Sequence, residues 1–446
     1  MKFSAWTRIF RAEDLRNRLL ITVALLLLYR LAAHVPVPGV DRAAIDALLS
    51  SQAGNFLSVL DLLSGGALQN FSVLAMGVYP YITAQIVLQL LVPVVPAWQR
   101  LMEEDPREGR KMIERYTYLL AIPMAFLNAF GQIQLFNNSA IGVVPLPNFG
   151  FTGDNLLPTL TTLITMTAGT MFAIWLGELI SEHGIRNQGI SLIIFAGIVA
   201  QLPNNLLSMW SDEQNRWLAL AVFVVLLIAV VFVIVYVTQG RRNIPVMYPG
   251  RRMGYRESMP VRGKLPLLVN MSGMIPIIFA QALLAFPGLL AGVFAGSGNP
   301  AIRDFMLGVS NLFLNPQSWT YIITYFIMVV GFTYFYTDVI FQQQSYGESL
   351  KRMGAQVPGV TRGAPTQRYL QRVLRRITLP GALLLGLVAV LPTLAGLAFV
   401  NSTSVQQAFF FLGSGLLIVV GTVKETFFGI ETELKTRGYD EGLLVR

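Results

Sequence analysis

The chain has 446 residues, of which 54% are hydrophobic and only 13% are charged. Soluble globular proteins carry roughly 25% charged residues, so this composition excludes an ordinary soluble fold and indicates a polytopic membrane protein. The chain contains no cysteine and two histidines. This excludes disulfides, thiolate catalysis, Cys-ligated zinc, iron–sulfur clusters and a histidine-rich metal site, and we expect no cofactor.

Ten apolar windows are predicted to be membrane-spanning helices, because a hydrocarbon core of about 30 Å needs about 20 helical residues. Basic residues precede the first window, as in a signal peptide, but no clean small-residue cleavage site follows, so we expect a retained span. The seventh window contains Pro276 and Pro287 and is expected to be kinked or tilted. The windows cover residues 19–35, 73–95, 117–136, 158–180, 189–209, 217–237, 266–294, 318–341, 377–400 and 405–423.

The basic residues are distributed unevenly between the two sides that these spans define. Of the 33 Lys and Arg residues, 29 fall on the side of the N-terminus, whereas the opposite loops hold only Arg42, Arg216 and Arg303. The positive-inside rule therefore predicts that both termini are cytoplasmic and that the protein lies in the cell membrane. The net charge of +9 is concentrated in the two largest cytoplasmic loops, 238–264 and 342–376, which we interpret as docking arms.

The segment between the first two spans is irregular. Residues 56–72 are too short and too interrupted to cross a bilayer, yet too apolar for a solvated loop, and Ser64-Gly65-Gly66 breaks any helix within them. Backbone of this kind is tolerated at membrane depth only inside protein or beside a water-filled cavity. We therefore expect this segment to fold back into the protein.

The spans divide into two sets of five around the external loop near residues 211–216. Five is odd, so if the two sets share a fold, the second is inverted relative to the first. We predict an all-α polytopic membrane protein with ten transmembrane helices in two inverted five-helix halves. The N-terminal half is 1–205, with spans one to five and the segment 56–72. The C-terminal half is 211–446, with spans six to ten and both basic loops.

Enzyme chemistry finds little support in the sequence. His34 and His183 are predicted on opposite sides of the membrane and cannot cooperate, and a serine dyad of an intramembrane protease would need Ser64 near His34. A secondary transporter, the second alternative, needs charged groups at mid-membrane beside broken helices, whereas the centre here is aliphatic. No phosphate-binding loop is present. The acids near the spans are scattered and favour structural pairing over ion coupling: Asp61, Glu178 and Asp338.

Residues 72–89, SVLAMGVYPYITAQIVLQ, carry a specific resemblance. This run is similar to the signature of the SecY family, which forms protein-conducting channels. Further similar segments follow the family in order along nearly the whole chain: Val35–Gly39, Leu63–Leu68, Gly169–Phe172, Ile194–Ala200, Asn270–Pro276 and Val357–Gly359.

The resemblance implies a channel and not an enzyme. Unfolded secretory proteins would cross a central pore between the halves, closed by a constriction of branched apolar side chains that dewets when it is empty. The positions that resemble this pore ring are Val78, Ile82, Ile190, Ile194, Ile278 and Ile418.

The resemblance also implies a plug and a lateral gate. Residues 56–72 would close the ring from the external side, and spans two and seven would part to release transmembrane segments into lipid. Gln89 and Asn270 would hold this gate shut by a polar contact. The central part of the plug would be Leu60, Asp61, Leu62, Leu63, Ser64, Gly65, Gly66, Ala67 and Leu68.

The partners implied are the small subunits SecE and SecG in a heterotrimer, the motor ATPase SecA, the ribosome, accessory SecDF and YidC, signal peptides, nascent chains and anionic lipids. The family's arginine after the Val357-Pro358-Gly359 turn is displaced here by one position to Arg362, and we expect Arg362 to replace it. The basic residues expected to contact the ribosome or SecA are Arg241, Arg242, Arg251, Arg252, Arg256 and Arg362.

Overall fold

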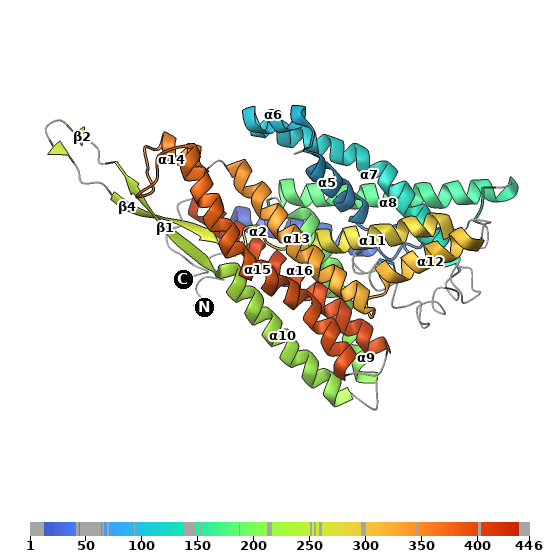
Figure 1. The fold of residues 1–446 in the computed structure, drawn as a ribbon. Coiled ribbons are helices and arrows are strands. Elements are labelled where there is room, and N and C mark those ends of the chain that lie inside the picture. Colours follow the sequence, from blue (N-terminus) through green and yellow to red (C-terminus); the bar gives the residue numbers. More distant parts are fainter. Residues whose placement is uncertain are drawn as a thin grey trace.

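The computed structural model describes residues 13–41, 44, 64, 67–68, 71–92, 94–137, 146, 149–151, 153–186, 188–211, 216–249, 252–253, 256–257, 261–295, 300–344, 346–399 and 403–436 (Figure 1). The first half of the chain is helical within these ranges. Its elements are α2 (Glu13–Ala32), α5 (Tyr79–Leu91), α6 (Pro96–Glu104), α7 (Pro106–Asn137), the 3-10 helix η1 (Gly153–Asn155), α8 (Leu156–His183) and α9 (Gly189–Ser211).

The second half adds a β-ribbon to its helices. The strands are β1 (Arg241–Tyr248), β2 (Arg252–Met253), β3 (Arg256–Glu257) and β4 (Val261–Leu268). The helices are α10 (Arg216–Gln239), α11 (Ile275–Ala295), α12 (Pro300–Leu314), α13 (Trp319–Gln344), α14 (Tyr346–Arg352), α15 (Ala364–Phe399) and α16 (Thr403–Thr436).

Each of the ten predicted spans overlaps a helix. Within the described ranges, six helices are long and apolar enough to cross a membrane, and α5 with the start of α6 makes a seventh if this pair, bent by 95°, is one span. A helix satisfies its own backbone hydrogen bonds, which is why apolar runs cross lipid in this form. The all-α polytopic membrane fold is confirmed, whereas the division into the inverted halves 1–205 and 211–446 stays a prediction.

The second span is shorter than the predicted window 73–95. Phe71 and Gly77 have φ angles of +41° and +51°, and such left-handed conformations do not belong in a helix. Residues 71–78 therefore form turns, and the helix begins only at Tyr79. Beyond Leu91 the chain bends, and Pro96 starts α6 in the helix-initiating position that proline favours.

The seventh span also starts later than predicted, at Ile275 instead of residue 266, because residues 261–268 pair as β4. A turn separates the strand from the helix, with Gly273 at a φ of +63°. Pro276 is tolerated as the second helical residue, where its missing N–H breaks no helical bond, whereas Pro287 lies inside α11.

The first predicted docking arm is a β-ribbon instead of an irregular loop. β1 and β4 are antiparallel, with Arg241 opposite Leu268 and Tyr248 opposite Val261. The ribbon projects away from the helical body and carries β2 and β3 towards its tip (Figure 1). The alternation of buried Ile244 and Val246 with exposed neighbours is the period of two that indicates a strand.

The two predicted docking arms are joined to each other. The Met247 N–H donates to the Gln356 carbonyl at 2.8 Å, and the Gln356 N–H donates to the Met247 carbonyl at 2.9 Å. Buried apolar side chains from both arms pack together beneath this bridge, and we call them the loop cluster. Its members are Ile244, Val246, Leu267, Phe341, Leu350, Ala355, Val357, Leu370 and Leu374.

The spans themselves pack around a larger hydrophobic cluster to which both halves contribute. Small residues allow close helix packing in membranes, where lipid is as apolar as leucine and supplies no hydrophobic drive. Ala125 and Ala129 of α7 and Ala282 and Ala285 of α11 are fully buried, and α7 packs against α11. α7 and α11, which are far apart in the sequence, therefore pack closely within the core.

Phe341 is the residue whose removal should loosen the docking arms. It is fully buried in the loop cluster, and its ring lies 5.4 Å from that of Tyr346. Phe341→Ala should cost about 3–5 kcal/mol of local stability through lost burial and the cavity left behind. We expect faster hydrogen exchange at the amides of β1 and β4, measured by mass spectrometry.

Met353 provides the control for this change, since its side chain is 55% exposed in the same loop. Met353→Ala should change stability by less than about 0.5 kcal/mol. Equal exchange in both variants and the wild type would show that the loop cluster does not hold the ribbon.

Candidate functional site

The six residues predicted for the pore ring all belong to the large hydrophobic cluster. Val78, Ile82, Ile194 and Ile418 are buried, and the other two are partly buried. Val78 directly precedes α5, and the other five lie on α5, α9, α11 and α16, of which α9 packs on α16 and α11 packs on both α5 and α16. The six thus belong to one extensive apolar core, while their convergence into a constriction stays a prediction.

Ser64 of the predicted plug lies against Gly77, in the turn that precedes α5. A methyl group at Gly77 would lie 2.8 Å from the Ser64 carbonyl oxygen and 2.9 Å from its Cα, which is closer than carbon atoms approach. The Tyr29 hydroxyl of α2 donates to the same carbonyl at 3.2 Å. Since Gly77 directly precedes Val78, the plug backbone packs next to a ring residue.

The end of the plug is tied into the turns before α5. The Ser72 hydroxyl donates to the Ala67 carbonyl at 3.1 Å, and the Phe71 N–H donates to the Leu68 carbonyl at 2.8 Å. Residues 35–37 then pair with 71–73, because Val73 donates to Val35 and Val37 donates to Phe71. Ala67 and Leu68 are buried here, and the remaining core positions (Leu60–Leu63, Gly65 and Gly66) lie outside the described residues.

The expected contact between Gln89 and Asn270 is not formed. The Asn270 amide donates to the Gly273 carbonyl at 2.9 Å, and its oxygen accepts from the Ser272 hydroxyl at 2.9 Å. The Gln89 side chain is half-buried, and its amide oxygen is buried without a hydrogen-bond partner among the described residues. Asn270 therefore shapes the turn that starts α11, because its own loop supplies nearer partners.

A hydrogen bond that we did not predict joins the two helices of the candidate gate. The Tyr79 hydroxyl of α5 donates to the Ala282 carbonyl of α11 at 3.0 Å. Tyr79 is 4% exposed and Ala282 is fully buried. A tyrosine in an apolar window could have predicted a hydrogen bond here, because a buried phenol usually finds a partner. The sequence could not predict the acceptor, because it is a backbone carbonyl.

His34, Ser64 and Asp338 each have local contacts of their own. His34 is exposed, and its Nδ1 lies 2.7 Å from the Arg30 carbonyl of its own helix, whereas Ser64 is buried. Asp338 pairs with Arg375, with 2.6 Å between Oδ2 and Nη2, which joins α13 to α15 and fits the expected structural pairing. Among the described residues, no three or more His, Asp or Glu gather into a metal-binding group.

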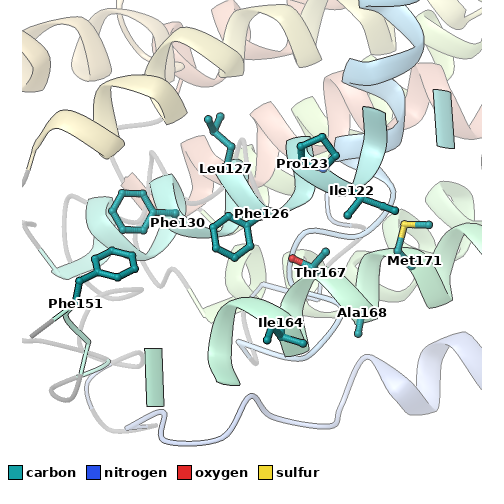
Figure 2. A pocket seen from close by; sticks show the side chains of 10 residues that line it. All are labelled: Ile122, Pro123, Phe126, Leu127, Phe130, Phe151, Ile164, Thr167, Ala168 and Met171. Carbon is teal, nitrogen blue, oxygen red and sulfur yellow. The ribbon is translucent and has the colours of Figure 1, made fainter. Parts of the chain in front are cut away.

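A groove of about 860 Å³ lies between α7 and α8 (Figure 2). Its one polar side chain, Thr167, donates its hydroxyl to the Leu163 carbonyl at 2.8 Å and is already satisfied. The groove therefore suits acyl chains and offers nothing to a polar solute. Its lining is Ile122, Pro123, Phe126, Leu127, Phe130, Phe151, Ile164, Thr167, Ala168 and Met171.

The structure gives the side-chain exposure of some predicted docking residues and only the backbone position of others. Arg241 and Arg242 are exposed at the base of the ribbon, where β1 leaves α10. Arg362 is exposed in the turn between Gly359 and Gly363, whose φ angles are +79° and +90°. Arg252 and Arg256 lie in β2 and β3, and Arg251 lies outside the described residues.

These features define a class of protein: a helical, multi-pass membrane protein in which an irregular internal segment packs against the start of a helix in an apolar core. The sequence profile of the SecY family matches residues 72–427. The chain belongs to the SecY family.

Relatives cover the full chain. Protein translocase subunit SecY of Streptomyces galbus is 36% identical over 454 residues, covering 99% of each chain. The subunit of that name from Halalkalibacterium halodurans is 38% identical over 452 residues, covering 98% of this chain and 99% of the relative. That of Vibrio cholerae is 35% identical over 434 residues, covering 97% and 94%.

Solved structures share the fold. A protein-conducting channel aligns with a TM-score of 0.62 at 18% identity, covering 94% of this chain and 92% of that one. Canine Sec61 in a ribosome–channel complex from the endoplasmic reticulum aligns with a TM-score of 0.58 at 19% identity, with the same coverage. The all-α arrangement is therefore that of known channels.

Gly77 gives a direct test of the plug contact. Gly77→Ala places a methyl group against the Ser64 backbone, so the plug should be displaced from α5. We expect the ion conductance of the resting protein in planar bilayers to rise severalfold.

Gly153→Ala is the matched control. Gly153 has a φ of +52°, so alanine suffers the same backbone strain of about 1 kcal/mol, yet a methyl group there meets nothing within 4 Å. If both variants leak equally, or neither does, the contact at Gly77 does not hold the plug.

Proposed function

We propose that this chain is the channel-forming subunit of a protein translocase in the cell membrane, with both termini in the cytoplasm. It passes unfolded secretory proteins through the ring of six apolar side chains and releases transmembrane segments sideways between α5 and α11. The observation that carries the proposal is the packing of the plug backbone on Gly77, directly beside ring residue Val78. Family membership supports the same conclusion.

The apolar ring accounts for passage without leakage. An aliphatic constriction is unfavourable for water and ions when it is empty. Branched side chains such as Ile82 and Ile194 also lack directional polar contacts, so a passing chain of any sequence forms no fixed bond with them. A constriction of this kind can open around a polypeptide and close again after the polypeptide has passed.

The plug contacts are suited to release. At Ser64 the plug is held by the hydrogen bond from Tyr29 to its carbonyl and by close packing on Gly77. A buried hydrogen bond contributes about 0.5–1.5 kcal/mol net. An incoming chain that displaces Ser64 removes both contacts together, and the plug returns when the pore empties.

The joined docking arms offer a basic surface to cytoplasmic partners. The ribbon presents exposed Arg241, Arg242 and Arg262, and the adjoining loop presents Arg362. Arginines of this kind suit the phosphates of ribosomal RNA, with affinity that falls as salt rises. We assign this surface to the ribosome and SecA. We expect SecE to bind on the side opposite the gate and to hold the two halves together there, with SecG, SecDF, YidC and anionic lipids as further partners.

Translocation by purified protein tests the proposal. The chain, co-purified with a partner of one to three spans, is placed in vesicles with SecA and ATP, and a secretory substrate is added. We expect the substrate to become protected from external protease only in vesicles that contain the chain. Lack of protection with the assembled complex would contradict the proposal. Full activity of the isolated polypeptide would contradict the proposed need for a partner subunit.

Arg362 tests the docking surface. Arg362→Glu should lower SecA-driven translocation by at least tenfold, because an exposed turn residue loses its attraction to an acidic partner, while ribosome-coupled insertion is largely kept. Arg352→Glu in α14 is the matched control, since it makes the same charge change at an exposed site of the same loop. Equal loss in both variants would indicate a general charge effect, and normal rates in Arg362→Glu would place motor contact elsewhere.

A further inference from the structure

A hydrogen bond crosses the seam between α5 and α11. The Tyr79 hydroxyl, at the start of α5, donates to the Ala282 carbonyl of α11 at 3.0 Å. This bond joins the two helices that must part if the gate opens sideways.

The Tyr79 bond lies next to the ring on both of its sides. Tyr79 directly follows Val78, and Ala282 lies one helical turn beyond Ile278. A chain that enters between Val78 and Ile278 moves these two helices apart at that level. The hydroxyl and the carbonyl are both buried, so no water is at hand to replace the bond while it breaks.

α11 is weakened at the same turn. Pro287 lies inside the helix and has no N–H, so the Leu283 carbonyl, one residue after Ala282, lacks its helical donor. Helices bend most readily at such positions. The Tyr79 bond therefore spans the seam where α11 bends most easily.

α11 is tied more firmly to its other neighbour. The Phe279 ring lies 6.2 Å from that of Phe332 and 5.6 Å from that of Tyr336, both in edge-to-face contact with α13. Aromatic pairs of this geometry add to the packing of α11 on α13. When α5 and α11 part, α11 and α13 should move together, so the Tyr79 hydrogen bond is the contact that breaks.

We propose that the Tyr79 hydroxyl is a specificity-determining latch, which sets how apolar a segment must be before α5 and α11 separate to admit it. This inference rests on the proposed function. An apolar helix that enters the seam offers packing but no acceptor for the phenol, so it must compensate for the lost bond. A less apolar helix cannot, and the gate stays closed to it.

Removal of one oxygen atom tests the latch. Tyr79→Phe keeps the ring and its packing but cannot donate to Ala282. The assay is protease protection in vesicles with substrates whose signal sequences form a series of rising leucine content. We expect the weakest signals to be translocated about three- to tenfold faster than by the wild type, the range of one interhelical hydrogen bond in a membrane. The strongest signals should change less than twofold.

Tyr81→Phe is the matched control. Tyr81 lies two residues further along α5 and faces α7, with its ring 5.6 Å from that of Tyr118, so loss of its hydroxyl should leave the threshold unchanged. A merely structural role of Tyr79 would lower the rates for all signals alike and would overturn the latch. Identical thresholds in Tyr79→Phe and an active wild type would overturn the latch alone, whereas an inactive wild-type complex would overturn the proposed function together with it.

Discussion

Water is absent from the membrane interior, so every backbone N–H and C=O of the irregular stretch between α2 and α5 needs a partner within the protein. The described part of that stretch meets this demand closely. Ser72 bonds Ala67, residues 35–37 pair with 71–73, and the Ser64 carbonyl accepts from Tyr29. These bonds hold the plug beside Gly77 and shorten α5, and the shortened helix places Tyr79 against α11. The predicted plug and the seam thus both depend on the hydrogen bonds that this irregular stretch makes within the protein.

The interior of this protein combines weak polar bonds with broad apolar packing. The buried alanines of α7 and α11 pack without directional bonds, while hydrogen bonds such as that from Tyr79 to Ala282 join particular helices. Apolar contacts exchange readily for contacts with another apolar helix, since lipid and leucine are alike in polarity. A bond to a buried carbonyl does not exchange in this way. We infer that stability and selectivity are carried by different groups.

The apolar windows predicted where helices lie, because a long apolar run in lipid has few alternatives to a helix. Their ends were harder to predict. Span two begins at Tyr79 because of backbone angles at Phe71 and Gly77, and phenylalanine gives no sign of a left-handed conformation. The ribbon was missed because its alternating residues are few and its arginines suggested a solvated loop. Asn270 was recognised as a polar residue of the seam, but the local turn decided its partner, which is the Gly273 carbonyl and not Gln89.

The central claim is that a secretory chain passes through the apolar region between the halves. A photo-crosslinking residue at Ile278, a ring position, tests it against one at Ile228, which is 62% exposed on α10. A stalled secretory chain should crosslink strongly at Ile278 and at background level at Ile228. Equal crosslinking at both positions, or crosslinking at Ile228 alone, would contradict passage through the ring.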